Sequence, residues 1–133
     1  MPRLEVHGAV YSNQGDSLFA YETWDLYKAA LELRKLVGKI GKQAPRGSGS
    51  DVDHLRRGSS SILFNLAEGY GHFSKGKKLE HYRIALGSAH ECHMALGVLA
   101  LDMPRNRWIP KARALCDRIV AMLTNLIKKI EGR

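Results

Sequence analysis

The sequence is poor in cysteine, no stretch of it resembles a signal peptide, and we expect no run of apolar residues long enough to cross a membrane. Cys92 and Cys116 are its only cysteines, and we expect both to be reduced, structural thiols, with a disulfide between them as the alternative. No segment reaches the roughly 20 apolar residues of a membrane span, and the N-terminus is mixed and polar. These absences predict a cytoplasmic protein without a membrane partner.

Acidic residues are also scarce relative to basic ones. The 133 residues include 13 acidic and 21 basic side chains, which gives a formal charge of +8. This excess is larger than solubility requires of a small domain, and a basic field attracts phosphate polymers and anionic membranes. The charge therefore favours binding of a polyanion over the alternative of a merely soluble basic protein.

Size and composition fit one packed domain. A chain of this length leaves little room for two domains, and it can bury roughly two thirds of its unfolded surface. Because 44% of the residues are hydrophobic and 26% are charged, a packed core is expected and wholesale disorder is not.

Apolar residues repeat at spacings of three and four along four segments, which is the pattern of bundle helices. The predicted helices cover residues 23–42, 51–70 (or from Asp53), 77–101 and 110–129. The predicted seam of the first helix is Leu26, Ala30, Leu33, Val37 and Ile40, and that of the third is Tyr82, Leu86, Ala89, His93, Leu96 and Ala100. Gly87 and Gly97 lie inside the third helix, where each costs up to ~1 kcal/mol, and they indicate the close approach of another backbone. No strand pattern appears after residue 20. The predicted fold class is all-α, an up-down-up-down antiparallel four-helix bundle.

The two ends of the chain fall outside this pattern. Residues 1–20 contain turn-prone residues and no sustained period, which predicts a loose arm with a short extended piece at residues 4–10. The bundle is expected to occupy residues 21–130. Residues 131–133 form a tail that matches, together with Ile130, a common protease-cleavage tag, so we assign it no function.

Polar strips accompany the apolar seams of the second and third helices. Helical spacing places four polar residues beside the seam of the second helix and two more, one turn apart, on the third. Either they are solvated, or they form a hydrogen-bonded network that fixes helix register or subunit docking, because unpaired buried polar groups are costly. The candidate network comprises Arg57, Ser61, Asn65, Glu68, Ser88 and Glu91.

Basic residues gather in places that helix dipoles do not explain. Cations near a helix C-terminus complement the dipole, which accounts for Lys39, Lys42, Lys128 and Lys129 without any ligand. The helix dipole does not explain the basic residues in the turn before the third helix or at the start of the fourth helix. The candidate nucleic-acid contacts are Arg56, Lys75, Lys77, Lys78, Arg105, Arg107, Lys111 and Arg113.

Three aromatic residues, Trp24, Phe73 and Trp108, lie near predicted helix ends or loops. Aromatic side chains in such places can stack on unpaired bases. More often they cover the end of a bundle core, and we favour that role here.

No constellation of residues indicates catalysis. His90 and His93 lie three apart and could share a metal ion on one helical face. However, His93 falls on the predicted seam, His90 lies roughly 60° around the helix from it, and the H-E-x-x-H spacing is absent. The G-S-G-S run at residues 47–50 lacks the lysine and the preceding strand of a P-loop. We expect no catalytic residue, no metal and no cofactor.

Two motifs in the second and third predicted helices resemble a known family. Residues 55–70 read L-R-R-G-S-S-S-I-L-F-N-L-A-E-G-Y, and residues 81–91 read H-Y-R-I-A-L-G-S-A-H-E. They are similar to the patterns L-R-R-A-x-x-S-I-x-x-N-I-A-E-G and F-x-x-x-A-x-G-S-x-x-E of the proteins encoded by intervening sequences in bacterial 23S ribosomal RNA genes. Gly58 replaces the usual alanine, and Tyr82 replaces the usual phenylalanine. With the similar run W-D-L-Y-K-A-A-L-E-L in the first helix, the resemblance covers about residues 21–130.

The resemblance implies a four-helix bundle that forms a ring-like homopentamer with a basic surface. A related branch, the accessory variability determinant of diversity-generating retroelements, assists a reverse transcriptase and binds nucleic acid. The resemblance also implies that the candidate polar network is structural. We expect a non-enzymatic homo-oligomer that binds RNA or DNA mainly through phosphate contacts. The alternatives are a protein-interaction scaffold or accessory subunit for a partner such as a reverse transcriptase, and a metal-dependent enzyme centred on His90 and His93.

Overall fold

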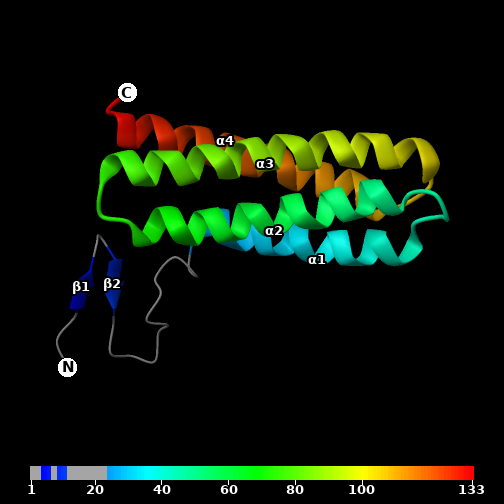
Figure 1. Cartoon of the computed structure of the whole chain (residues 1–133), viewed down its shortest axis with the longest axis horizontal. Helices are drawn as coiled ribbons and strands as arrows, with labels where there is room; N and C mark the ends of the chain where they lie inside the picture. The colour runs from blue at the N-terminus through cyan, green and yellow to red at the C-terminus, as the bar shows by residue number, and fades with distance from the viewer. Residues whose placement is uncertain (1–3, 7–8, 12–23) are drawn as a thin grey trace.

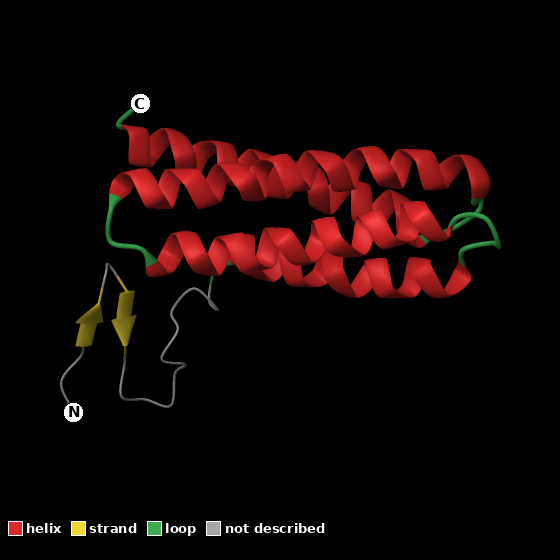
Figure 2. Cartoon of the chain, in the orientation of Figure 1, coloured by secondary structure: helices red, strands yellow, loops and turns green. Residues whose placement is uncertain are grey.

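The computed structural model describes residues 4–6, 9–11 and 24–133. Four helices account for most of the described chain, and they run up-down-up-down in a single bundle (Figure 1). They are α1 (Asp25–Gln43), α2 (Gly49–Gly71), α3 (Lys75–Asp102) and α4 (Trp108–Glu131). Each packs against two neighbours, since α1 and α3 both contact α2 and α4. The predicted all-α four-helix bundle is confirmed, and helices dominate the view coloured by secondary structure (Figure 2).

Two short strands precede the bundle. They are β1 (Leu4–Val6) and β2 (Ala9–Tyr11), and they pair antiparallel with Val6 opposite Ala9. The sequence predicted one extended piece over residues 4–10 instead of a pair of strands. Residues 1–3, 7–8 and 12–23 lie outside the described residues, and with them most of the predicted loose arm and Thr23 at the predicted helix start.

Side-chain caps fix where two of the helices begin. Ser74 Oγ accepts a hydrogen bond from the backbone N–H of Lys77 at 3.1 Å, so α3 begins at Lys75. Asn106 Oδ1 accepts from the N–H groups of Trp108 and Ile109 at 2.9 and 3.1 Å, so α4 begins at Trp108. Each cap satisfies N–H groups that the first helical turn leaves without partners. Both helices therefore start two residues earlier than apolar periodicity predicted.

The core-facing seam of α3 differs from the predicted one. Tyr82, Ala89 and Leu96 are buried as expected. Between them, however, the buried positions are Ala85, Cys92 and Leu99, whereas the predicted Leu86, His93 and Ala100 are only half-buried. The prediction was wrong at these alternate positions because α3 is apolar on more than one side. Apolar spacing alone therefore does not show which side of α3 faces the core.

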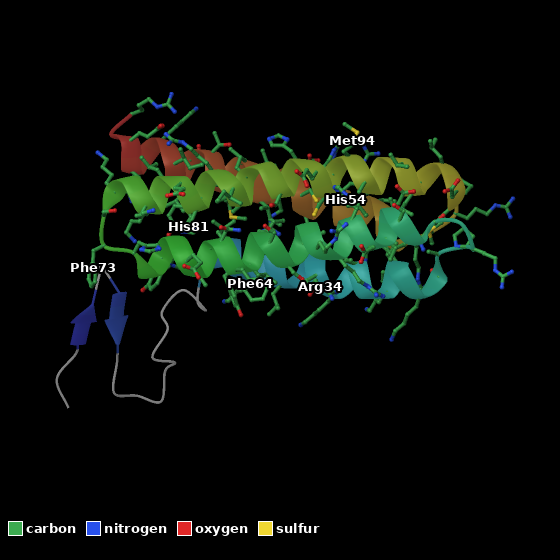
Figure 3. All side chains as sticks on the ribbon, in the orientation of Figure 1. Arg34, His54, Phe64, Phe73, His81 and Met94 are labelled. Carbon is green, nitrogen blue, oxygen red and sulfur yellow. The ribbon has the colours of Figure 1, made fainter. Side chains whose placement is uncertain are left out.

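A second apolar stripe of α3 faces away from the bundle. It comprises Ile84, Gly87, Met94, Val98 and Leu101, all at least partly exposed, is interrupted by the charged Glu91, and is called the α3 stripe below. Met94 and Leu101 are 70% and 81% exposed, and Met94 lies on the outer side of α3 in Figure 3. The alternating spacing of three and four residues is that of a helix-packing seam. One face of α3 thus has the pattern of a seam, yet none of the described helices covers it.

The two-sided apolar character of α3 also gives it the composition of a membrane span. Among the described helices it is the one that is long and apolar enough, with a mean hydropathy of 1.3 over 18 residues, of which 39% are buried in the bundle. The sequence analysis found no such segment. Length and composition alone carry this signal, and a core helix of a soluble protein gives it as well.

Both cysteines are buried and free. Burial raises the pKa of the Cys92 thiol and that of the Cys116 thiol to about 12 each. A thiol with such a pKa stays protonated near neutral pH, and the thiolate is the reactive form. The two side chains therefore serve as small apolar groups in the core.

Gly69 allows α2 and α3 to approach closely. A Cβ atom added there would lie 2.5 Å from Cε1 of Tyr82, whose ring is almost fully buried. Since the ring has little room to retreat, we expect Gly69→Ala to lower the free energy of unfolding by about 1–3 kcal/mol. Chemical denaturation measures this change. Gly76→Ala is the matched control, because a Cβ there meets no atom within 4 Å; equal stability of both variants would contradict the close packing described.

Candidate nucleic-acid interface

The two predicted basic clusters lie at opposite ends of the bundle. Lys75, Lys77 and Lys78 are in the first turn of α3, whereas Arg105 and Arg107 precede α4 at the far end (Figure 1). The 28 residues of α3 separate these ends by about 40 Å, at 1.5 Å per residue. Within one subunit the two clusters are therefore separate surfaces.

The lysines at the start of α3 are largely engaged in local contacts. Lys78 Nζ donates to the carbonyl oxygens of Gly69 and Tyr70 at 3.0 and 3.1 Å, which satisfies acceptors at the C-terminus of α2. Partial burial lowers the pKa of Lys78. Lys77 Nζ lies 3.2 Å from Glu80 Oε2. Of the three predicted contacts in this turn, Lys78 has a structural role and Lys77 a carboxylate partner, which leaves Lys75.

At the other end, three cations gather around Trp108. Lys39 Nζ and Arg107 Cζ each lie 4.5 Å from a Trp108 ring centroid, and Lys111 Nζ lies 5.8 Å from it. Cations within about 6 Å of an aromatic face are attracted by the ring quadrupole. Lys39, Arg107, Trp108 and Lys111 are called the Trp108 cluster below. It joins the end of α1 to the start of α4.

No carboxylate neutralises the Trp108 cluster among the residues that the structure describes. None of Lys39, Arg107 and Lys111 takes part in an ion pair within residues 24–133. The three side chains are exposed, and Trp108 is half-buried against the core. Three positive charges thus share one small surface, where their mutual repulsion favours an anion between them.

A hydrogen bond holds the two elements of the cluster together. Asn106 Nδ2 donates to Gln43 Oε1 at 2.8 Å, which links the loop before α4 to the last residue of α1. The same Asn106 caps α4 through its Oδ1 atom. This loop therefore ties the start of α4, next to Arg107, to the end of α1, which carries Lys39.

The remaining predicted contacts do not belong to this cluster. Arg105 is exposed in the same loop. The guanidinium of Arg56 lies against α1 at Gly41, and that of Arg113 lies beside Gly97 of α3, with its Nε atom buried and without a hydrogen-bond partner. Sequence analysis missed Lys39, because the dipole of α1 accounted for its charge. The signal that could have identified Lys39 was Trp108. Its ring lies at the start of α4, which runs antiparallel to α1, and cations from both helices contact it.

The candidate polar network divides into two groups. Ser88 Oγ donates to Ser61 Oγ at 2.9 Å across α2 and α3, and Asn65 Nδ2 donates to the carbonyl oxygen and Oγ of Ser61 at 2.9 and 3.2 Å. His81 Nδ1 extends the chain to Asn65 Oδ1 at 2.9 Å. The structure thus brings together Ser61, Asn65 and Ser88, and adds His81, which the sequence analysis did not include.

The other three candidates lie outside this hydrogen-bonded chain. Arg57 pairs with Asp53 at 3.2 Å, Glu68 with His72 at 3.7 Å, and Glu91 with His54 at 3.4 Å. The side chains of these pairs are 40–73% exposed, and such pairs contribute little to stability. The partly buried register contact between α2 and α3 therefore rests on two serines and an asparagine.

His90 and His93 do not come together with further metal ligands in the described part of the chain. His93 Nε2 lies 3.5 Å from Asp117 Oδ1 of α4, and His90 is exposed. Neither belongs to a group of three side chains with metal-ligating spacing.

Comparison with curated proteins finds no match. A model of the family described as 23S rRNA-intervening sequence protein matches residues 22–125, which include α1, α2, α3 and most of α4. The match covers well over half of the chain and includes both motifs on which the resemblance was based. The chain belongs to the family of 23S rRNA-intervening sequence proteins.

Proposed function

We propose that this protein is a non-enzymatic homo-oligomer that binds RNA or DNA through phosphate contacts made by the Trp108 cluster. The observation that carries the proposal is the convergence of Lys39, Arg107 and Lys111 on one indole without a carboxylate partner among the described residues. A phosphate placed among them would offset their repulsion and accept charge-assisted hydrogen bonds.

The α3 stripe supports self-association. Its apolar residues have the spacing of a packing seam, and a large exposed apolar patch marks an interaction site. A Cβ at Gly87 would meet no atom within 4 Å, and one at Gly97 would meet only the side chain of Arg113. The close backbone approach indicated by these glycines is therefore not made by the described part of the subunit. We propose that a second copy of the chain makes it, and the family resemblance implies five copies in a ring.

Ring assembly would strengthen weak phosphate contacts. Cyclic symmetry places every copy of the Trp108 cluster at the same level of the ring. A nucleic acid that touches one cluster then meets the next at a high effective concentration. Binding with little sequence selectivity follows, because phosphates position a nucleic acid without reading its bases.

A protein-interaction scaffold, or an accessory subunit for a partner such as a reverse transcriptase, is the second candidate. The α3 stripe supports this second candidate, because an exposed apolar face can also bind a different protein. Pull-down with and without nuclease separates the two functions. Partners that persist after nuclease treatment would favour the scaffold.

Binding is expected to fall steeply with salt. Each phosphate contact adds about 0.9 to the magnitude of the log–log salt slope on duplex and about 0.7 on single strands. We therefore expect micromolar protein to shift structured RNA and duplex DNA at low salt, and to release them between about 50 and 200 mM. Gel shifts over this range measure the slope. The absence of any shift at the lowest salt would defeat the proposed function.

A further inference from the structure

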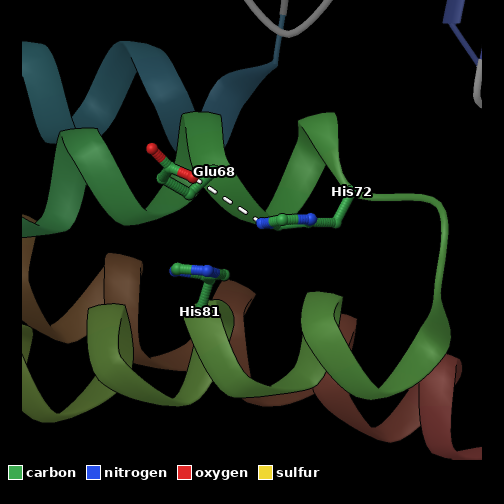
Figure 4. A group of neighbouring side chains, drawn as sticks. All are labelled: Glu68, His72 and His81. Carbon is green, nitrogen blue, oxygen red and sulfur yellow. Dashed lines mark ion pairs between the residues drawn. The ribbon is translucent and has the colours of Figure 1, made fainter.

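Three potential metal ligands lie together where α2 ends and α3 begins (Figure 4). Glu68 and His72 come from the last turn of α2 and its cap, and His81 comes from α3. One ligand atom from each side chain lies within 4.8 Å of the other two. We propose that Glu68, His72 and His81 bind a divalent transition-metal ion, with Zn²⁺ as the best fit to these ligands.

The hydrogen bonds around His81 leave its Nε2 atom available to a metal. Asn65 uses its amide nitrogen on the carbonyl oxygen of Ser61, so its Oδ1 faces His81. An amide oxygen only accepts hydrogen bonds, and Nδ1 of His81 must therefore carry the proton. In the neutral ring, Nε2 then presents a lone pair. A metal-bound histidine typically has its other nitrogen held in this way by an oxygen acceptor.

The same hydrogen bonds fix the position of the ligand. Ser61, which holds Asn65, itself accepts from Ser88 Oγ of α3 at 2.9 Å. His81 is thus oriented by a chain of polar groups that ties α2 to α3. This gives Asn65 a second use besides helix register, since it sets both the tautomer and the ring orientation of one ligand.

The ring of His72 has to rotate before it can share an ion with His81, because an imidazole binds a metal in its ring plane and the two rings are stacked with an interplanar angle of 10°. His72 Nε2 lies 3.7 Å from Glu68 Oε2, and the rings of His72 and His81 are stacked with their centroids 5.1 Å apart. Ligand atoms around a tetrahedral zinc ion, at about 2.0–2.2 Å from it, lie about 3.3 Å from one another. His72 caps the C-terminus of α2, where the chain leaves the helix. Its ring can therefore turn toward the other two ligands while His81 stays in place.

The ligand types select the ion. Imidazole nitrogen suits zinc, copper and nickel, whereas magnesium and calcium take oxygen ligands. Two histidines and one carboxylate form a three-ligand set that leaves the fourth position of zinc open to water. Bound zinc would join the end of α2 to α3 and so stabilise the turn between them. It would thus raise the stability of the fold by mass action.

Zinc titration of the whole chain, purified without a polyhistidine tag, tests the proposal. Calorimetry is expected to show one Zn²⁺ per chain, with a rise in Tm and no response to Mg²⁺. His72→Ala and His81→Ala should each weaken binding at least about tenfold, and Asn65→Ala, which keeps all three ligands, by about 10–100-fold. His90→Ala is the matched control and should bind as the wild type does.

Two outcomes would overturn the proposal. One is no binding below about 100 µM Zn²⁺, and the other is unchanged affinity in both His72→Ala and His81→Ala. The His72 side chain is 40% exposed at a helix end, so its variant keeps the test valid if His81→Ala fails to fold. The metal site and the Trp108 cluster occupy opposite ends of the bundle (Figure 1). Failure of either proposal therefore leaves the other standing.

Discussion

Replacing Lys39, Arg107 and Lys111 together by glutamine is expected to weaken duplex binding roughly 500-fold at about 0.1 M salt for each subunit that contacts the duplex, because three fewer phosphate contacts per subunit lower the magnitude of the log–log salt slope by about 2.7. The smaller slope is the more specific result, since it reports how many phosphates the protein neutralises. Fluorescence anisotropy of a labelled duplex over a range of salt concentrations measures both quantities. Because all three side chains are exposed, the free energy of unfolding should change by no more than about 0.5 kcal/mol each.

The matched control removes the same charge from the other end of the bundle. Lys75, Lys77 and Lys128 are exposed there, and their joint replacement by glutamine leaves the Trp108 cluster intact. We expect this control to retain most of the affinity and most of the slope. Equal weakening of the two triple variants would mean that binding follows net charge alone, and the Trp108 cluster would then have no special role.

Introducing glutamate at Met94 and Leu101 is expected to convert the proposed oligomer to monomers. The two side chains are the most exposed members of the α3 stripe. Burying a carboxylate without a partner in an apolar seam costs more than a subunit contact supplies. Light scattering should then fall from a multiple of the chain mass to about the single-chain mass of 14.9 kDa.

Apolar swaps at the same two positions serve as the control. Met94→Leu and Leu101→Met keep volume and hydrophobicity, so the assembled mass should persist. A wild-type chain that is already monomeric would contradict the proposed self-association. So would a glutamate variant that keeps the wild-type mass.

The fold was predictable because most of its helices are apolar on a single side. In α1, the predicted positions Leu26, Ala30, Leu33, Val37 and Ile40 are all buried. The seam of α3 was misplaced because its core-facing residues and its stripe have the same spacing of three and four. Periodicity identifies a helix, but it does not say which of two apolar faces packs inside the subunit.

The candidate sites were less predictable because their residues come from different elements. Lys39 meets Trp108 only once α1 and α4 lie side by side, and His81 meets His72 only across the turn between α2 and α3. Lys78 had the charge of a phosphate contact, yet it caps α2 through carbonyl oxygens eight and nine residues away. Such contacts depend on how the chain turns between two helices. The spacing of residues along a single helix does not show this.

The two tryptophans, at opposite ends of the bundle, provide the most direct test of the central claim. Trp24 packs edge-on against Tyr70, with ring centroids 5.0 Å apart, so Trp24→Phe keeps an aromatic ring there and leaves Trp108 as the sole tryptophan emitter. RNA added to this variant at low salt should quench the emission of Trp108 with the same midpoint as binding, and added salt should restore it. If the RNA binds and the emission does not change, phosphates do not occupy the cations around Trp108, and the proposed interface is wrong.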